Sequence, residues 1–485
     1  MKSPILISPD AFEGNKHWYP KALNATIHPM VAFFLNLSQE RIVKRYCHLN
    51  PVVKPEDLMQ WMKYQPKHFY WAGTDLIHVT SETGKRQMVV IETNSCPSGQ
   101  KSMPLLDDHQ EMGGYEILMR DTFKPMLKNR RLPEGALAVI YDKNPMESSG
   151  YAGAMASVFQ EPVHLIPFYN NQDEQRIRLN TENILEFLND DDQWMPLRAV
   201  FRYLTQKPWN RLPVKSKTFI FNPVIACLAG GRNKMVASKA YEFFNAEVAD
   251  TGLKIATPET IWDVSKNEVP LWVQKMGGQA VIKIPYSNAG QGVFTIVTPQ
   301  ELDDFMAKEY DYDQFIVQSL IGNYQWSSHT QGGKFYHVGT MPNKKGESFA
   351  ADVRMMLQST PQGFRPLSIY ARRAAVALPD ELGSGVDSWQ ILGTNLSIKL
   401  DANQWSSDTD RLLLMDRRDF NRLGVGLDDL IQGYIQTLLA TVAIDKMAIK
   451  LIGTKGNLKT KLFRSLNNDP SLLSEIMASK KESNG

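Results

Sequence analysis

The stretch from Gly135 to Phe168, GALAVIYDKNPMESSGYAGAMASVFQEPVHLIPF, limits what this chain can fold into more than any other. Its pattern predicts a strand, a turn, a helix of small residues and a second strand. Two strands of one sheet that are joined through a helix run parallel to each other. The sequence therefore predicts an α/β (α+β) fold with a βαβ lobe, which we place within residues 131–215.

The rest of the chain divides around this lobe into three further units. The chain has 485 residues, which is too long for one ordinary core and suggests two to four domains or subdomains. Residues 1–130 show amphipathic helical patterns followed by two β-rich runs. Residues 216–450 alternate strand and helix patterns and end in a long helix. Residues 451–485 are polar and basic, and we expect them to form a tail with a frayed end.

Composition excludes several classes of partner. The 54 Lys and Arg residues nearly balance the 52 Asp and Glu residues, for a formal charge of +2 at pH 7. This balance favours neither nucleic acid nor a membrane as a partner, and no segment reaches about 18 uninterrupted apolar residues. The three cysteines, Cys47, Cys96 and Cys227, lie far apart and match no metal-binding spacing. We therefore expect a cytoplasmic protein.

A glycine-rich hairpin follows a lysine in the segment VIKIPYSNAGQGVF. Lys283 ends a predicted strand, and the backbone N–H groups of the turn can fold over phosphate groups while the lysine supplies positive charge. The segment is not a Walker loop, because it lacks GxxxxGK[ST] and no helix follows the turn. A hairpin beside a surface lysine is the alternative interpretation. The candidate phosphate contacts in the turn are Ser287, Asn288, Gly290 and Gly292.

Oxygen-bearing side chains lie on a second predicted hairpin, TDLIHVTSETGKRQMVVIETN. Glu92 and Asn94 are two residues apart on one strand, so both side chains point to the same face and can present hard oxygen ligands to Mg²⁺. Asp75, on the paired strand, can complete the site. The alternative is that these residues form the exposed face of an edge strand, with Asn94 opening the turn.

Taken together, these segments resemble the working parts of the ATP-grasp superfamily. The segment NKMVASKAYEFF, with Lys234, is similar to the first lysine region of that family, and AVIKIPYSNAGQGVF, with Lys283, to the second. FIVQSLIG resembles the hinge strand that holds adenine and ribose, which implies contacts from Gln318 and Leu320. The second hairpin resembles the metal-binding strands. The resemblance covers roughly residues 71–375 and implies ATP and two Mg²⁺ ions as cofactors.

The order of these segments points to one branch of that superfamily. The metal-binding strands precede both lysines here, whereas in most ATP-grasp enzymes they follow them. Such a permuted order resembles glutathionylspermidine synthetases and eukaryotic-type glutathione synthetases; the ATP-grasp peptide ligases are a third comparison. The resemblance implies an ATP-grasp fold with permuted strand order, metal strands within residues 1–130 and nucleotide-binding subdomains within residues 216–450, beside a Rossmann-like βαβ substrate lobe.

Two positions depart from the family pattern. Many relatives carry an arginine two residues before the first metal aspartate, where this chain has Gly73. The charge that stabilises the oxyanion must then come from elsewhere, and the candidates are Arg354 and one of the neighbouring pair Arg372 and Arg373, which face opposite ways on a strand. The turn also lacks the glutamate that binds metal in the glutathione synthetases, and Asn288 is its candidate substitute.

The resemblance implies an ATP-dependent carboxylate-amine ligase that works through an acylphosphate and releases ADP and phosphate. Its substrates would be a small carboxylate and an amine, such as an amino acid or a peptide, and dimers are common in the superfamily. The segment SCPSGQKSMP is expected beside the substrate, with Ser98, Gly99 and Ser102 as contacts. The alternatives are a phosphotransferase and a nucleotide-binding module without catalysis.

Overall fold

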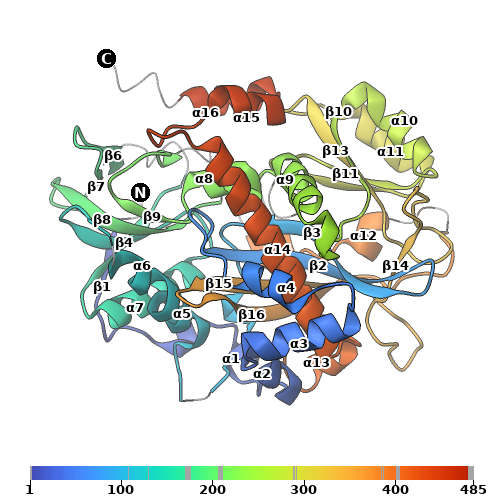
Figure 1. Cartoon of the computed structure of the whole chain (residues 1–485), viewed down its shortest axis with the longest axis horizontal. Helices are drawn as coiled ribbons and strands as arrows, with labels where there is room; N and C mark the ends of the chain where they lie inside the picture. Colours follow the sequence, from blue (N-terminus) through green and yellow to red (C-terminus); the bar gives the residue numbers. More distant parts are fainter. Residues whose placement is uncertain are drawn as a thin grey trace.

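The protein has a mixed α/β fold, shown in Figure 1. The computed structural model describes residues 3–107, 109–128, 130–169, 176–205, 211–287, 290, 292–383, 385, 387–399 and 405–478. Within these residues the strands form three larger sheets and one two-stranded ribbon of β17 (Ser397–Lys399) and β18 (Trp405–Ser407). No helix of the described part is both long and apolar enough to span a bilayer.

The predicted βαβ unit is confirmed and lies in a seven-stranded sheet. The strands of this sheet are β1 (Ile5–Ile7), β4 (Ala136–Tyr141), β5 (Val163–Pro167), β6 (Ile177–Leu179), β7 (Leu185–Leu188), β8 (Trp194–Tyr203) and β9 (Phe219–Phe221). β4 runs parallel to both β5 and β8, and β8 runs parallel to β9. Helix α7 (Pro145–Phe159) joins β4 to β5. The small side chains of α7, such as Ala152 and Ala156, are fully buried and allow close packing.

The second predicted hairpin is confirmed in a six-stranded antiparallel sheet. Its strands are β2 (Trp71–Ser81), β3 (Arg86–Asn94), β14 (Phe335–His337), β15 (Ala351–Thr360), β16 (Gly363–Arg373) and β19 (Leu412–Leu413). β2 pairs with β3 on one side and with β14 and β15 on the other, so β3 is an edge strand. The sheet thus joins segments from the beginning and the end of the chain.

One extra residue in β3 decides which way its side chains point. Asp75 pairs with Glu92, but the next residue of β2, Leu76, pairs with Val90, so Ile91 has no opposite residue. Such a β-bulge shifts the alternation of side chains by one position. Leu76 and Val90 therefore face the hydrophobic core, whereas Asp75 and Glu92 face the other side of the sheet.

The glycine-rich segment lies in a four-stranded antiparallel sheet with its own hydrophobic core. Its strands, in spatial order, are β10 (Thr260–Ser265), β13 (Gln314–Ser319), β11 (Ala280–Lys283) and β12 (Val293–Ile296). Helices α10 (Val269–Lys275) and α11 (Pro299–Ala307) accompany this sheet at the upper right of Figure 1. The predicted order of strand, turn, strand and a helix from Pro299 is confirmed.

A long helix, α14 (Leu427–Leu451), packs against the core face of the six-stranded sheet and crosses the middle of Figure 1. It is about 37 Å long at 1.5 Å per residue. It also contacts α9 (Lys234–Glu247) and the amino-terminal helices α2 (Pro29–Leu35), α3 (Gln39–Leu49) and α4 (Pro55–Met62). Side chains all around it, such as Tyr434, Leu438 and Ile444, are fully buried, as expected of a central helix.

The carboxyl-terminal segment differs from the expected tail. It forms α15 (Thr460–Leu466) and α16 (Pro470–Ala478), and Phe463 and Leu472 are buried in the main core. The remaining helices are short: α1 (Pro20–Leu23), α5 (Gly113–Leu118), α6 (Lys124–Lys128), α8 (Val224–Ala226), α12 (Ser388–Leu392) and α13 (Asp419–Arg422).

Candidate active site

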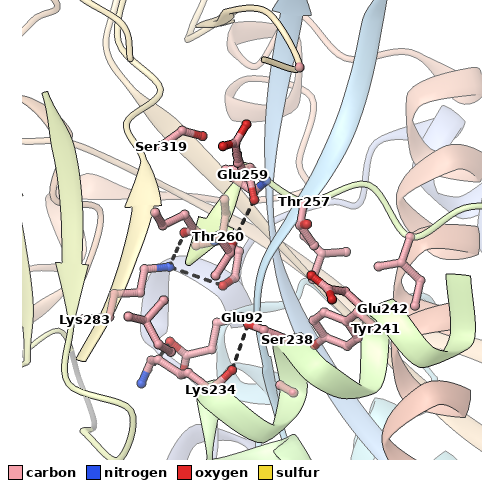
Figure 2. A pocket seen from close by; sticks show the side chains of 18 of the residues that line it. Glu92, Lys234, Ser238, Tyr241, Glu242, Thr257, Glu259, Thr260, Lys283 and Ser319 are labelled. Atoms are coloured by element: carbon pink, nitrogen blue, oxygen red, sulfur yellow. Dashed lines mark hydrogen bonds and ion pairs between the residues drawn. The ribbon is translucent and has the colours of Figure 1, made fainter. Parts of the chain in front are cut away.

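A cavity of about 410 Å³ lies where β3, α9 and the four-stranded sheet meet. This volume is in the range of small-molecule and cofactor sites. Five residues predicted to bind ATP or metal line it together: Glu92, Lys234, Lys283, Gln318 and Leu320. Figure 2 shows the side chains of Glu92, Lys234 and Lys283, which come from three different elements and face the same space.

Two buried lysines supply the positive charge of the cavity. Lys234 is the first residue of α9, and its Nζ lies 3.6 Å from Glu92 Oε2. Lys283 is the last residue of β11, and its Nζ donates to Gln318 Oε1 at 2.6 Å. Their side chains are more than nine-tenths buried. Buried ammonium groups require compensation by negative charge. In this cavity the carboxylate of Glu92 supplies negative charge to both lysines.

Burial disfavours the charged form of both lysines. It lowers the pKa of Lys283 to about 8, with Glu92 opposing the shift and Lys234 adding to it. Burial also lowers the pKa of Lys234, again against the attraction of Glu92. An anionic ligand in the cavity would favour the charged form of both groups.

The glycine-rich turn lies beside Lys234. The carbonyl oxygen of Ser287 accepts a hydrogen bond from Lys234 Nζ at 2.9 Å. Gly290 has a φ of +76°, which favours glycine. A Cβ at Gly292 would lie 2.4 Å from Ser287 Cβ, so the tight turn requires glycine there as well. Asn288 lies outside the described residues.

Asp75 lies one strand further into the sheet and is held by two arginines. In one row across the sheet, Glu92 pairs with Asp75, Asp75 with Arg354 and Arg354 with Tyr370. The Arg354 guanidinium donates to both oxygens of Asp75, at 2.5 and 2.7 Å. Arg372 Nη2 lies 3.0 Å from the same carboxylate. Burial raises the pKa of Asp75, but the two guanidinium groups outweigh it and hold this pKa well below its usual value.

The other predicted metal ligand, Asn94, is buried opposite Gly73. Its Nδ2 atom is buried without a hydrogen-bond partner. Because amide oxygen and nitrogen are assigned from their neighbours, either atom of Asn94 can occupy that position. Among the described residues, no group of three or more His, Cys, Asp and Glu side chains is placed to hold a metal ion.

The neighbouring arginines of β16 separate as alternation requires. Arg372 lies on the face of Asp75 and also binds both oxygens of Asp352. Arg373 does not join this group: its guanidinium donates to the Ala374 carbonyl and stacks over Phe349. Of the pair, Arg372 is therefore the one near the predicted chemistry.

The segment after β3 passes directly over Arg354. Ser98 O accepts from Arg354 Nη1 at 3.1 Å and from the Tyr370 hydroxyl at 2.9 Å. Gly99 has a φ of +144°, and a Cβ there would lie 1.9 Å from the Tyr370 ring. Ser102 is buried in a short 3₁₀ turn and donates its backbone N–H to Gly99 O.

Two residues near these groups are absent from the predicted set. Arg232 lines the cavity beside Lys234. It precedes Lys234 by two residues in GGRNK, and this closeness to a predicted ATP-binding lysine could have identified it from the sequence. Glu147, in the first turn of α7, accepts hydrogen bonds from the loop of Ser98. A glutamate in a first helical turn is ordinary, so nothing in the sequence distinguishes this one.

Known proteins provide distant structural likenesses. No protein-family model matches the chain, and no curated protein matches it. A glutathione synthetase-like effector from Globodera pallida is similar with a TM-score of 0.39 and 10% identity, covering 71% of this chain and 81% of that chain. A RimK domain ATP-grasp protein from Sphaerobacter thermophilus has a TM-score of 0.28 and 12% identity, covering 48% and 90%. D-alanyl-alanine synthetase A from Vibrio cholerae has a TM-score of 0.29 and 10% identity, covering 49% and 89%.

Proposed function

We propose that this chain is an ATP-dependent ligase that joins a carboxylate to an amine through an acylphosphate. The observation that carries the proposal is the meeting of Lys234, Lys283 and Glu92 in one cavity. Two buried cations and one carboxylate suit a nucleoside triphosphate with its metal ion. The phosphate oxygens would neutralise the lysines, and the positive charge would stabilise the transferred phosphoryl group. Gln318 and Leu320 would contact the base and ribose end of the nucleotide.

The residues around Glu92 fit a metal ion in part. Glu92 offers a carboxylate to the cavity, and the unpartnered amide atom of Asn94 would be satisfied by a cation if it is the oxygen. Asp75 can contribute only by sharing its oxygens with Arg354 and Arg372. We propose Glu92 and Asn94 as the principal Mg²⁺ ligands. Asp75, on the paired strand, would be a secondary ligand because its oxygens are shared with the two arginines. Mg²⁺, when bound, would offset the charge of the phosphates.

Arg354 is proposed to stabilise the oxyanion that forms when the amine attacks. Its guanidinium is fixed by Asp75 and by the Ser98 carbonyl, so little reorganisation is needed. Arg372, bound to Asp75 and Asp352, is the second candidate. The segment of Ser98 and Gly99 would then line the acid or the amine, with Ser102 beneath it. The substrates would be small molecules, such as amino acids or peptides.

Hydroxylamine tests the ligase reaction directly, because it traps acylphosphates as hydroxamates. We expect phosphate release from ATP and MgCl₂ that requires both hydroxylamine and one member of a panel of amino acids and short peptides. Lys283→Ala and Glu92→Gln should each lower the rate by about a hundredfold. The control Lys275→Ala, on the exposed side of α10, should leave it unchanged.

Three outcomes distinguish the alternatives. A stable phosphorylated product that forms without hydroxylamine would indicate a phosphotransferase. Binding of ATP without turnover for any panel member would support a nucleotide-binding module. Full activity in both Lys283→Ala and Glu92→Gln would show that the chemistry lies elsewhere.

A further inference from the structure

A buried carboxylate on the βαβ lobe holds the segment that passes over Arg354. Glu147 is fully buried in the first turn of α7. Its Oε1 accepts from the backbone N–H groups of Gly99 at 2.7 Å and Gln100 at 2.6 Å. Its Oε2 accepts from the hydroxyls of Ser98 at 2.7 Å and Tyr203 at 2.9 Å.

These four hydrogen bonds provide the observed compensation for the charge of Glu147. No lysine or arginine in the described part of the chain forms an ion pair with it among the contacts within 4.0 Å. A carboxylate has about four good acceptor positions, and four donors use them. Because a buried charge must be satisfied, the Ser98–Gln100 backbone is fixed to α7.

The same segment is fixed to the six-stranded sheet on its other side. The Ser98 carbonyl accepts from Arg354 Nη1 and from Tyr370. The guanidinium of Arg354 therefore has two anchors: Asp75 binds Nε and Nη2, and Ser98 binds Nη1. Without the second anchor, the position of Nη1 would no longer depend on the βαβ lobe.

We propose that Glu147 is a positioning residue for Arg354, acting through Ser98, Gly99 and Gln100. It connects the βαβ lobe to the row of Asp75 and Arg354, so the placement of the lobe sets the geometry of the oxyanion-stabilising group. The proposal rests on the function proposed above for Arg354. It also predicts that Glu147 fixes the Ser98–Gln100 backbone whether or not a substrate is bound.

Three substitutions separate the position of the carboxylate from its charge. Glu147→Ala removes the acceptor. Glu147→Asp keeps the charge and most of the volume but withdraws the oxygens by one methylene. Glu147→Gln keeps one oxygen for the two backbone N–H groups, and its NH₂ group can donate to the two hydroxyls, which rotate to accept. Glu116→Gln is the matched control, because Glu116 is half-buried and, within the described part of the chain, its carboxylate pairs with its helix neighbour Arg120.

The kinetic test uses the hydroxamate assay with the amino acid or peptide that gives turnover. In Glu147→Ala and Glu147→Asp we expect kcat to fall by about tenfold or more, with KM for ATP within about twofold of the starting protein. Glu147→Gln should retain kcat within about threefold. The Glu147→Ala/Arg354→Lys double variant should be no more than about threefold slower than Arg354→Lys alone, because the two residues act in series.

A second measurement needs neither substrate nor activity. Hydrogen exchange at the amides of Gly99 and Gln100 should be at least about tenfold faster in Glu147→Asp than in the starting protein or Glu116→Gln. Unchanged exchange at these amides would overturn the proposal, as would an unchanged kcat in Glu147→Ala or losses that multiply in the double variant. If the starting protein shows no acid-dependent turnover, the ligase proposal fails, and the exchange rates alone decide whether Glu147 fixes the loop.

Discussion

Lys283 shows how burial prepares a single side chain for an anionic ligand. Its pKa is lowered to about 8, because burial disfavours the ammonium group more than Glu92 favours it. Between about pH 8 and the unfolded value near 10.5, the unfolded chain binds more protons at this residue than the folded chain. Raising the pH through this window therefore increases the contribution of Lys283 to folding stability.

Nucleotide binding should depend on pH in the opposite direction. Phosphate oxygens bind the ammonium form, so affinity for ATP should fall as pH rises above about 8. We expect the Kd for ATP, measured by calorimetry, to be about tenfold higher at pH 9.5 than at pH 7. Lys283→Arg should show a smaller rise, because arginine stays charged over this range. An equal Kd at both pH values would contradict the role given to Lys283.

Single residues of the site differed in how well they could be predicted. The spacing of Glu92 on its strand and the lysine before the glycine turn are local features, and both residues line the cavity. The bond between Asp75 and Arg354 spans 279 residues, so no local pattern predicts that this carboxylate is already paired. The separation of Arg372 from Arg373 follows from strand alternation, but which of them faces Asp75 depends on the register.

At the scale of elements, the helices at the carboxyl end contradict the expected tail. Asn467, between α15 and α16, is fully buried and accepts a hydrogen bond from the hydroxyl of Tyr286, which precedes the glycine-rich turn. Its Nδ2 donates to Asn233, the residue that caps α9 before Lys234. The segment was difficult to predict because its buried apolar residues are few and because Asn467 bonds to Tyr286 and Asn233, which lie 181 and 234 residues away in the chain.

Asn467 should therefore affect both stability and nucleotide binding. In Asn467→Ala the hydrogen bond between the Tyr286 hydroxyl and Asn467 is lost, and we expect a loss of about 1–3 kcal/mol in the free energy of unfolding. Affinity for ATP should fall as well, because the turn and the start of α9 lose a shared contact. Asn421→Ala is the control, since Asn421 is exposed and its Nδ2 donates to the Arg417 carbonyl four residues earlier. Denaturant unfolding and calorimetry measure the two effects, and a change no larger than that of the control would contradict this role.

Most elements that the sequence predicted are present. Alternating or strongly apolar runs identify β2, β3, β15 and β16, and the glycine turn joins β11 to β12 as predicted. The bulge at Ile91 was not foreseen, because strict alternation is the only local signal for the face of a strand. It results from pairing with β2, which the sequence of β3 does not specify.

At the scale of the whole molecule, the cavity is made by elements that do not form one continuous sheet. Glu92 belongs to the six-stranded sheet, Lys283 to the four-stranded sheet and Lys234 to a helix packed on α14. A ligand that contacts all three links them and so opposes unfolding. This placement could be proposed from sequence only through the family resemblance, because composition and periodicity say nothing of how separate sheets meet.

The midpoint of thermal unfolding should therefore depend on both the nucleotide and the metal ion. At a hundredfold excess of ATP over its Kd, binding to the folded state adds about 2.7 kcal/mol, and we expect the midpoint to rise by at least about 2 °C with ATP and MgCl₂. With ATP and EDTA the rise should be smaller, because the phosphates then repel Glu92. In Glu92→Gln the difference between MgCl₂ and EDTA should shrink. The same midpoint with and without ATP in the starting protein would argue against a nucleotide site.

The bulge at Ile91 makes the pairing of β3 with β2 as important as residue identity at this edge of the molecule. If β3 paired with β2 without the bulge, Ile91 would lie opposite Asp75, and unbroken alternation would turn Glu92 toward α14 and Thr93 toward the face of Asp75. The same amino acids would then place a carboxylate in the hydrophobic core and a methyl-bearing hydroxyl beside the two lysines. In comparisons with other chains, a one-residue gap at Ile91 would still be compatible with a carboxylate in the cavity, because plain alternation would then keep Val90 opposite Leu76 and Glu92 opposite Asp75.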